Sequence, residues 1–334
     1  MNIVILISAP DSRGLVHKIS SNLLDFNIEK NDEFVDKESG QFFMRTEISV
    51  ESNAESASFG GFESLREGRT LLFAFTKSSK NFLDSTPCAE SALDSTIPQN
   101  LADSTLESAP DSTSAIKNEI YNRLCAILPP QSFIKITQKR KKSIVIFCTK
   151  EAHCLGDLLL KNYNNELNID IRAVVSNHAT LGDLVEKFHI PYFHISHSDE
   201  NYENKMLAIC DEFAPDFIVL AKYMRILSPH FIAHYENRII NIHHSFLPAF
   251  IGANPYKQAY TRGVKIIGAT AHFVTSELDS GPIICQDIMQ VNHTLSWRDM
   301  QKAGKNIERV VLARAVELAV EERIFIHKNR TIVF

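Results

Sequence analysis

One apolar run of the sequence ends in side chains that exchange protons. Residues 238–250 read RIINIHHSFLPAF, so an amide, two imidazoles and a hydroxyl follow directly after two isoleucines. On a strand, side chains two positions apart point the same way, so Asn241 and His243 share one face. A neutral amide donates hydrogen bonds to a developing oxyanion, and an imidazole donates or passes a proton. This stretch is therefore a candidate site for acid–base chemistry.

A carboxylate further along the chain complements these two groups. Asp279 lies in the polar loop TSELDSGP, residues 275–282, which follows a strand-like run. A carboxylate activates water and stabilises a charged imidazole, so Asn241, His243 and Asp279 form one acid–base set if they meet. The two segments are distant in sequence, and spacing alone leaves open whether they share a site.

Two further histidines lie in the same segments. For His244 and His272, a buried hydrogen-bonding role and a catalytic role both stay open. A zinc site made by His243, His244 and His272 is a further alternative. We do not expect a metal, because adjacent His243 and His244 face opposite sides of a strand.

These residues need a scaffold, and the C-terminal half of the chain supplies a regular one. Strand–helix alternation predicts a mostly parallel sheet with helices on both faces. In such sheets ligands bind beyond the carboxyl ends of the strands, where Asn241 and His243 fall. The predicted strands are 143–148, 170–175, 191–195, 216–221, 239–242, 265–274 and 283–291, and the predicted helices are 153–163, 181–188, 203–213 and 307–322.

The N-terminal half has a different pattern. A strand, a helix and two strands precede residues 51–114, and a helix and a strand follow them. Residues 51–114 are rich in Ser, Ala, Asp and Thr and repeat the tripeptide Asp-Ser-Thr, which predicts a disordered insertion in which only 70–76 has strand character. We expect two domains, residues 1–138 and residues 143–334, joined by the basic linker 139–142.

Composition excludes several classes of function. The chain has 334 residues, 44% of them hydrophobic, and 35 basic against 40 acidic residues give a net charge of −5. This charge favours neither nucleic acid nor an anionic membrane as a partner. The N-terminus has no basic start and its apolar run is short, so we expect a soluble, cytoplasmic protein. No Cys-x-x-Cys pair occurs among Cys88, Cys125, Cys148, Cys154, Cys210 and Cys285, which indicates idle thiols.

Several runs in order resemble known families. Three runs resemble the folate-dependent formyltransferase fold, which is the fold of glycinamide ribonucleotide transformylase. They are NIHHSFLP (241–248), GATAH (268–272) and LDSGP (278–282). Three further runs resemble the formyltetrahydrofolate deformylase family. They are TKEAHCLGDLL (149–159), LAKYMR (220–225) and NRTI (329–332). The order of strands and helices in the N-terminal half, with the run PDSRGL at 10–15, is similar to that of the ACT domain of the deformylase family. The resemblance covers nearly everything except residues 51–114.

The resemblance implies a fold and a reaction. The expected fold is α/β, with an N-terminal ferredoxin-like βαββαβ ACT domain followed by a Rossmann-like formyltransferase domain with a mostly parallel sheet. The expected activity is hydrolysis of 10-formyltetrahydrofolate at a linear amide C–N bond, which yields formate and tetrahydrofolate. The expected role is to supply formate for purine biosynthesis and to balance one-carbon folate pools. Folate is then the substrate, and no cofactor is expected.

The resemblance also assigns residues. The catalytic trio carries over to Asn241, His243 and Asp279, and the expected substrate-binding residues are Met224, Arg225, Leu227, Thr275 and Glu277. The ACT domain implies regulation by small amino acids such as methionine and glycine, and homo-oligomers through paired ACT domains. Candidates for the regulatory amino-acid site are Asp11, Gly14 and Asn31.

Two positions depart from the patterns of these families. The transformylase cradles its acceptor's phosphate in a Gly-rich turn after the first strand, but here no glycine occurs before Gly156, and Glu151 repels an anion. The lack of a glycine-rich turn in this segment favours water over a phosphorylated molecule as the acceptor of the formyl group. Asn254 stands where the deformylase pattern has an arginine, so the contact of that arginine does not carry over to this position.

Two other functions remain as alternatives. One is a formyltransferase with an amine acceptor, although a tRNA formyltransferase would need a further C-terminal domain. The other is an amino-acid sensor with a degenerate catalytic half, which the intact trio disfavours.

Overall fold

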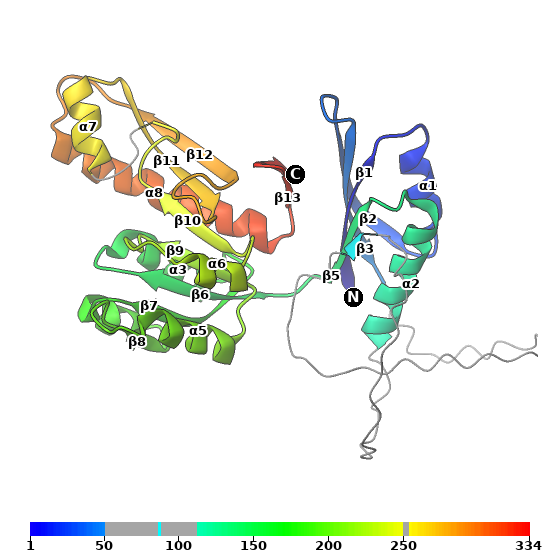
Figure 1. Cartoon of the computed structure of the whole chain (residues 1–334), viewed down its shortest axis with the longest axis horizontal. Coiled ribbons are helices and arrows are strands. Elements are labelled where there is room, and N and C mark those ends of the chain that lie inside the picture. Colours follow the sequence, from blue (N-terminus) through cyan, green and yellow to red (C-terminus); the bar gives the residue numbers. More distant parts are fainter. Residues whose placement is uncertain (51–85, 88–111, 250–253) are drawn as a thin grey trace, which may run out of the picture. The chain divides into compact units, whose positions relative to one another are not determined.

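The computed structural model describes residues 1–50, 86–87, 112–249 and 254–334. The chain divides into two compact units, Met1–Lys139 and Arg140–Phe334 (Figure 1). Most of the predicted insertion 51–114, including the strand predicted at 70–76, lies outside the described residues. Two parts of it are described and have regular structure, because Thr86–Pro87 pairs with the edge of a sheet and a helix already begins at Ser112.

The N-terminal unit is an antiparallel sheet with two helices, and its four long strands have the ferredoxin-like order. The order in the sheet is β2-β3-β1-β5-β4, and β1 lies antiparallel between β3 and β5. Alternate residues of β1, such as Ile3, Ile5 and Ile7, are buried in one core with apolar residues of the helices. The elements are β1 (Asn2–Pro10), α1 (Leu15–Ser21), β2 (Asn27–Asp36), β3 (Gln41–Ser49), β4 (Thr86–Pro87), α2 (Ser112–Ile127) and β5 (Phe133–Gln138).

The C-terminal unit is built on a seven-stranded sheet in the order β12-β11-β10-β9-β6-β7-β8. The strands from β10 to β8 in this order run parallel, while β11 and β12 are antiparallel additions at one edge. The strands are β6 (Lys142–Cys148), β7 (Ile169–Ser176), β8 (Tyr192–His194), β9 (Phe217–Ala221), β10 (Ile239–His243), β11 (Ile266–Phe273) and β12 (Ile283–Gln290).

Helices cover both faces of this sheet, which explains why its central strands are apolar throughout. On β6, Ile144 and Ile146 belong to a core with residues of α3 and α8, while Val145 and Phe147 belong to a second core with residues of α5 and α6. The remaining elements include a short 3₁₀ turn, η1, and a terminal hairpin, β13–β14. The bounds are α3 (Ala152–Tyr163), η1 (Ala179–Leu181), α4 (Gly182–Glu186), α5 (Tyr202–Phe213), α6 (Pro229–His234), α7 (Pro255–Arg262), α8 (Trp297–Val320), β13 (Ile324–His327) and β14 (Arg330–Val333).

Helix α8 is longer than the sequence predicts. It begins at Trp297 rather than at Ile307, with a capping box between Ser296 and Asp299. Its first turns contain Gly304, where a Cβ atom would lie 2.0 Å from the hydroxyl oxygen of Tyr256. The glycine therefore permits a close contact between α7 and α8, although the same glycine weakens the sequence signal for a helix. Among the described residues, no helix is long and apolar enough to cross a membrane.

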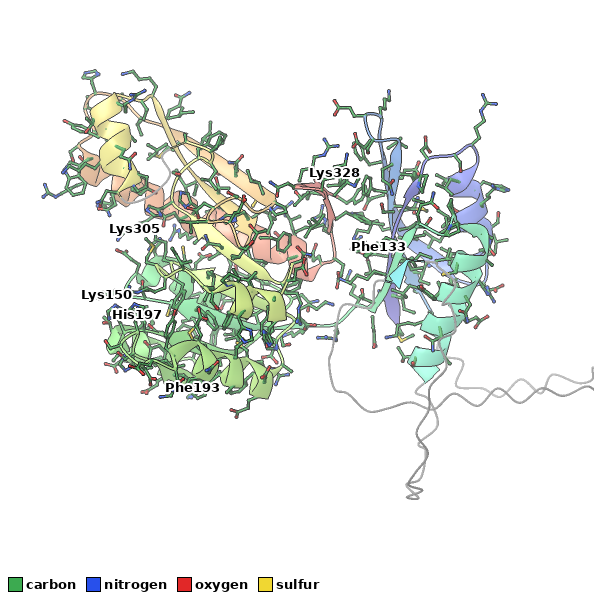
Figure 2. All side chains as sticks on the ribbon, viewed as in Figure 1. Phe133, Lys150, Phe193, His197, Lys305 and Lys328 are labelled. Atoms are coloured by element: carbon green, nitrogen blue, oxygen red, sulfur yellow. The ribbon has the colours of Figure 1, made fainter. Side chains whose placement is uncertain are left out.

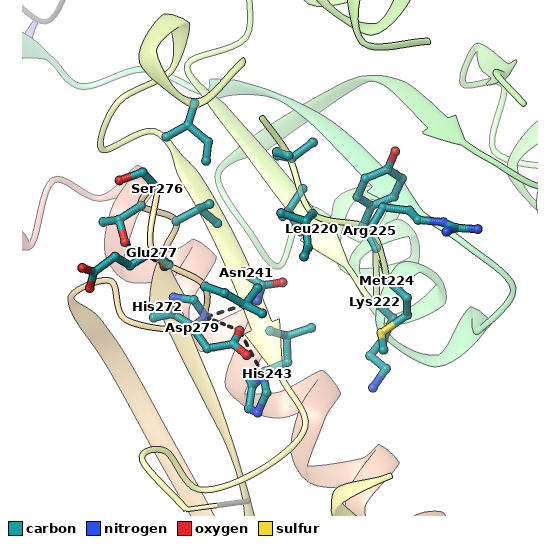
Figure 3. Close-up of a pocket in the computed structure, with 18 of the residues that line it drawn as sticks. Leu220, Lys222, Met224, Arg225, Asn241, His243, His272, Ser276, Glu277 and Asp279 are labelled. Carbon is teal, nitrogen blue, oxygen red and sulfur yellow. Dashed lines mark hydrogen bonds and ion pairs between the residues drawn. The ribbon is translucent and has the colours of Figure 1, made fainter. Parts of the chain in front are cut away.

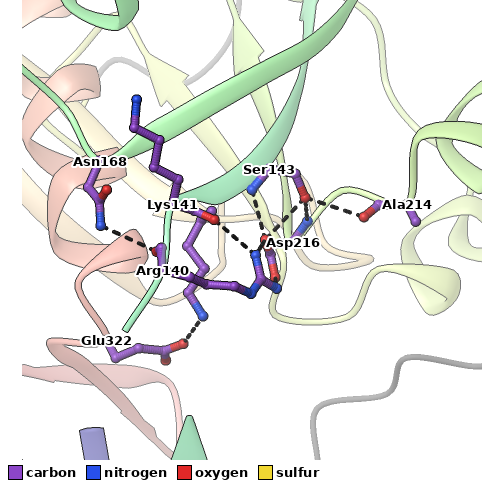
Figure 4. Close-up of polar contacts among 8 residues, drawn as sticks. Arg140, Lys141, Ser143, Asn168, Ala214, Asp216 and Glu322 are labelled. Carbon is purple, nitrogen blue, oxygen red and sulfur yellow. Dashed lines mark hydrogen bonds and ion pairs between the residues drawn. The ribbon is translucent and has the colours of Figure 1, made fainter. Parts of the chain in front are cut away.

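The amino ends of β6 and β9 are joined by the half-buried carboxylate of Asp216 (Figure 4). Asp216 accepts hydrogen bonds from the backbone N–H of Ser143 at 2.8 Å and from the Arg140 guanidinium at 2.6 Å. Burial alone would raise the pKa of Asp216, but these donors hold it below its usual range. These contacts lie at the amino edge of the sheet. They leave open the opposite, carboxyl edge, where ligands bind in sheets of this kind.

Candidate active site

A cavity of about 430 Å³ opens at the carboxyl ends of β9 and β10. It is lined by the segment Lys222–Leu227 after β9, by the end of β10 and by the loop 275–279 after β11 (Figure 3). The predicted catalytic residues, Asn241, His243 and Asp279, all line it. So do the predicted substrate-binding residues, which are Met224, Arg225, Leu227, Thr275 and Glu277.

His243 and Asp279 are in direct contact. The Nδ1 atom of His243 lies 3.2 Å from Oδ1 of Asp279, and the two side chains are only 6% and 10% exposed. The hydrogen bond from His243 lowers the pKa of Asp279, against the opposing effect of burial, so Asp279 is ionised at neutral pH. The other ring nitrogen of His243, Nε2, is buried and makes no hydrogen bond with any described residue. A donor or acceptor is thus left for a ligand.

The side chain of Asn241 is oriented by His272. Nδ1 of His272 lies 2.9 Å from the carbonyl oxygen of Phe273, which only accepts hydrogen bonds, so Nδ1 carries the proton. Burial lowers the pKa of His272, which keeps the ring neutral and leaves Nε2 as an acceptor. The Asn241 amide nitrogen donates to that Nε2 at 3.1 Å. The amide is therefore held in one orientation, and sequence reasoning could not assign this role to His272.

The loop that carries Asp279 is held on its C-terminal side. Asp279 itself has a φ of 56°, and Gly281 packs so closely on β11 that a Cβ atom there would lie 1.8 Å from the carbonyl oxygen of Phe273. From the terminal hairpin, the Asn329 amide donates to the carbonyl of Ser280 at 3.1 Å. The Thr331 hydroxyl likewise donates to the carbonyl of Ile283 at 2.6 Å. These contacts fix the position of the carboxylate.

His244 follows His243 but has a different environment. Its ring lies 5.3 Å from that of His243, and it lines both the first cavity and a second one. Burial, with the nearby charge of Lys222, lowers the pKa of His244 to about 4. His244 is therefore neutral at physiological pH.

The second cavity, also of about 430 Å³, shares Lys222, Met224 and His244 with the first. Beneath it lies Glu308 of α8, whose side chain is 1% exposed. Its carboxylate lies 2.8 Å from His153 Nε2, 3.2 Å from Lys222 Nζ and 2.6 Å from the Tyr256 hydroxyl. Burial alone would raise the pKa of Glu308, but these partners lower it to about 2. Sequence reasoning missed this cluster.

The same cluster contains atoms at metal-ligand spacing. Ligand atoms of His153, Cys154 and Glu308 lie within 4.8 Å of one another. However, burial raises the pKa of the Cys154 thiol, so it stays protonated, and Lys222 already neutralises Glu308. The arrangement fits an ion-pair cluster better than a metal site.

Two positions that depart from the family patterns have clear local roles. Glu151 stands at the N-cap position of α3 without a side-chain capping hydrogen bond and forms an ion pair with Lys305 at 2.5 Å, so a carboxylate lies near the helix N-terminus, where a phosphate could bind. Asn254 stands at the N-cap position of α7 without a side-chain capping hydrogen bond. Its φ of 56° is a left-handed conformation that asparagine tolerates, and the residue lines the second cavity.

In the N-terminal unit, the three regulatory candidates do not converge within one chain. Asp11 and Gly14 lie in the turn between β1 and α1, where Gly14 has a φ of 75°. Asn31 lies within β2 and is paired with Thr46 of β3. Thr46 is paired in turn with Ile5 of β1, so Asn31 and Ile5 lie at the same level of the sheet. At about 3.4 Å per residue, Ile5 and Asp11 are roughly 20 Å apart.

A mostly parallel sheet with the Asn241, His243 and Asp279 cavity at its carboxyl edge agrees with the formyl transferase class, and residues 142–316 match the Formyl transferase family. The chain is 42% identical to the formyltetrahydrofolate deformylase of Haemophilus influenzae over 99% of its length and 98% of that protein. It is 37% identical to the Bacillus subtilis deformylase over 99% and 93%. The chain belongs to the formyltetrahydrofolate deformylase family.

Solved structures agree with this assignment. A formyltetrahydrofolate deformylase from Pseudomonas syringae pv. tomato superposes with a TM-score of 0.77 at 34% identity, covering 100% of this chain and 94% of that one. Glycinamide ribonucleotide transformylase 1 from Symbiobacterium toebii gives 0.57 at 26% identity and covers 59% of this chain and 96% of its own. The expected α/β fold is thereby confirmed.

Proposed function

We propose that this protein hydrolyses 10-formyltetrahydrofolate to formate and tetrahydrofolate. The observation that carries the proposal is the contact between His243 Nδ1 and Asp279 Oδ1 at 3.2 Å, with the unbonded Nε2 of His243 and the oriented amide of Asn241 lining the same cavity. An ionised carboxylate beside two hydrogen-bonding groups is suited to addition of water to a carbonyl.

The reaction follows from these positions. Asp279 accepts a proton from water, and the water oxygen attacks the formyl carbon. Asn241 donates a hydrogen bond to the oxyanion, and His243 donates one from Nε2 when both of its ring nitrogens carry a proton, each contributing about 3 kcal/mol to stabilisation of the transition state. When the intermediate collapses, the bond between carbon and N10 breaks, and the proton held by Asp279 passes to N10. The formic acid releases its remaining proton to solvent and leaves as formate, tetrahydrofolate leaves with it, and Asp279 is ionised again.

The cavity suits a ligand with a flat apolar part. Its rim exposes three large apolar side chains, Met224 (56%), Ile226 (68%) and Leu278 (58%), which a bound aromatic group would cover. The segment between β9 and α6, residues 222–228, belongs to no helix or strand. Its backbone groups are suited to pair with the edge of the pterin, while Thr275 and Glu277 line the cavity from the loop after β11.

The test is formate release from 10-formyltetrahydrofolate with no acceptor present. We expect Asp279→Asn and His243→Ala to reduce kcat by about a hundredfold or more, because each removes a group that acts in the transition state. Asp211→Asn on α5 and His293→Ala after β12, both exposed, are matched controls that keep full activity. Near-normal turnover in Asp279→Asn would contradict the proposal.

The cellular role and the regulation extend the proposal. Formate released here would supply purine biosynthesis, and methionine or glycine would act through the N-terminal unit. Because Asp11 and Asn31 lie roughly 20 Å apart along the sheet of one chain, a shared ligand requires a second copy. This supports a homo-oligomer paired through its N-terminal units. Binding of methionine that depends on oligomer formation would test it.

A further inference from the structure

The segment between β9 and α6, residues 222–228, is irregular but is held firmly at its first residue. Lys222 has a φ of 62°, a left-handed conformation that a lysine keeps only where its surroundings fix it. Its backbone N–H donates to the carbonyl of Leu220 at 3.1 Å, and its carbonyl accepts from the Thr149 hydroxyl at 2.9 Å. Its buried side chain places Nζ 3.2 Å from the carboxylate of Glu308. Both the backbone and the side chain of Lys222 are therefore fixed.

Glu308 is a rigid partner for Lys222 because it also binds two other helices. Its carboxylate, which is 1% exposed, lies 2.8 Å from Nε2 of His153 on α3 and accepts from the Tyr256 hydroxyl on α7 at 2.6 Å. Glu308 lies one turn after Lys305 on α8, and the labelled Lys305 marks this part of the helix in Figure 2. The first end of the segment is thus tied to the face of the sheet that α3 and α8 cover.

The last residue of the segment is held from the opposite face of the sheet. Glu203, in the first turn of α5, accepts a hydrogen bond from the backbone N–H of Ser228 at 2.8 Å and another from the Ser228 hydroxyl. The Ser228 oxygen accepts in turn from the backbone N–H of Phe231 at 3.2 Å, which caps α6. Helices α5 and α6 pack on the second core of the sheet. Two carboxylates, one from each face, therefore hold the two ends of one segment.

The middle of the segment faces the first cavity. Tyr223 and Leu227 are buried in the second core. Met224 and Ile226, which lie between them, are mostly exposed and line the cavity. A bound ligand therefore meets Met224 and Ile226 where the two ends of the segment place them.

The two carboxylates themselves lie outside this cavity. Glu308 borders the second cavity and Glu203 borders the hollow beside Ile226, and among the described residues neither of them lines the first cavity. The reacting groups lie on β10 and in the loop after β11, so they do not depend on either tie. Loss of a tie should therefore change substrate affinity rather than the chemical step.

We propose that Glu203 and Glu308 are positioning residues, which hold the 222–228 segment in the shape that binds the substrate. They set the affinity for 10-formyltetrahydrofolate from outside the cavity, each through the end of the segment that it binds. This inference rests on the proposed function.

The first test measures KM and kcat for formate release in Glu203→Ala, which removes both acceptors of Ser228. We expect KM to rise about tenfold, the factor that corresponds to loss of one charge-assisted hydrogen bond, while kcat stays within about twofold of the wild-type value. Glu203→Gln keeps an acceptor for the Ser228 N–H and should restore most of the affinity. Glu212→Ala, which changes an exposed glutamate of the same helix, is the matched control and keeps the wild-type KM.

The tie through Glu308 needs a paired change, because a single substitution leaves Lys222 buried without its counter-charge. The double variant Lys222→Met with Glu308→Gln removes the tie and the unpaired charge together. We expect its KM to rise about tenfold as well, with kcat again within about twofold of the wild-type value.

Proteolysis reports on the segment directly. Arg225 is exposed in its middle, so trypsin should cleave after Arg225 faster in Glu203→Ala and in the double variant than in the wild type or in Glu212→Ala. A wild-type KM in both altered proteins would overturn the inference, as would a loss confined to kcat. Formate release by the wild-type protein tests the proposed function separately, so the two can fail independently.

Discussion

The carboxylate of Asp279 and the imidazole of His243 lie 3.2 Å apart although they belong to a loop and to a strand that are distant in sequence. The hydrogen bond from His243 is the largest influence that keeps the pKa of Asp279 low, and burial opposes it. Through this contact His243 sets the protonation state of Asp279.

This dependence predicts a shift of the pH profile. In His243→Ala the donor is lost while burial of Asp279 remains, so the pKa of Asp279 rises. The acid limb of the residual kcat/KM should then move to higher pH than in the wild type. Rates of formate release measured from about pH 3 upward follow this limb, because the ordinary pKa of an aspartate is about 3.9. An unchanged acid limb would show that Asp279 does not depend on His243.

His272 should act on catalysis through Asn241. In His272→Leu the acceptor for the Asn241 amide is lost, so we expect kcat to fall by about tenfold to a hundredfold, less than the loss of an entire oxyanion donor. His272→Gln offers an amide oxygen as the acceptor and should restore part of the rate. A purely structural role would lower the thermal midpoint of both variants equally and leave no difference in kcat between them.

Gly281 should be essential for the position of Asp279. In Gly281→Ala the new methyl group would lie 1.8 Å from the carbonyl oxygen of Phe273, so the loop must move away from β11. We expect a large loss of kcat and a destabilisation of about 1–3 kcal/mol, as is usual for overpacking. The Gly156→Ala variant on α3, where a Cβ atom meets no heavy atom within 4 Å, is the matched control and keeps activity. Thermal unfolding and formate release are measured on both.

The sequence was informative about the reacting groups and much less about what supports them. The strand ending in Asn241 and His243 and the loop with Asp279 were predictable, because local apolar patterns and turn residues mark them. The contacts of His272 were not, since they join neighbouring strands through a register that no single segment encodes. Glu308 was missed because a charged residue in a helix is normally solvated, and only the packing of α3, α7 and α8 makes it buried.

Glu308 should contribute to stability in a pH-dependent way. Its pKa is lowered from 4.5 to about 2, so the contribution is complete above pH 4.5 and is lost as the pH falls toward 2. Glu308→Gln leaves Lys222 buried without a counter-charge and should destabilise the protein by about 3 kcal/mol near neutral pH. The variant should also show a shallower loss of stability in acid. Urea unfolding at several pH values measures this, with Glu317→Gln, an exposed member of an i,i+3 pair, as the control.

The hairpin β13–β14 acts on the site from outside the cavity. Its Asn329 and Thr331 donate to the carbonyls of Ser280 and Ile283, which follow Asp279 in the chain. A substitution that loosens this hairpin would therefore release the carboxylate from its place beside His243, although it changes no residue that lines the cavity.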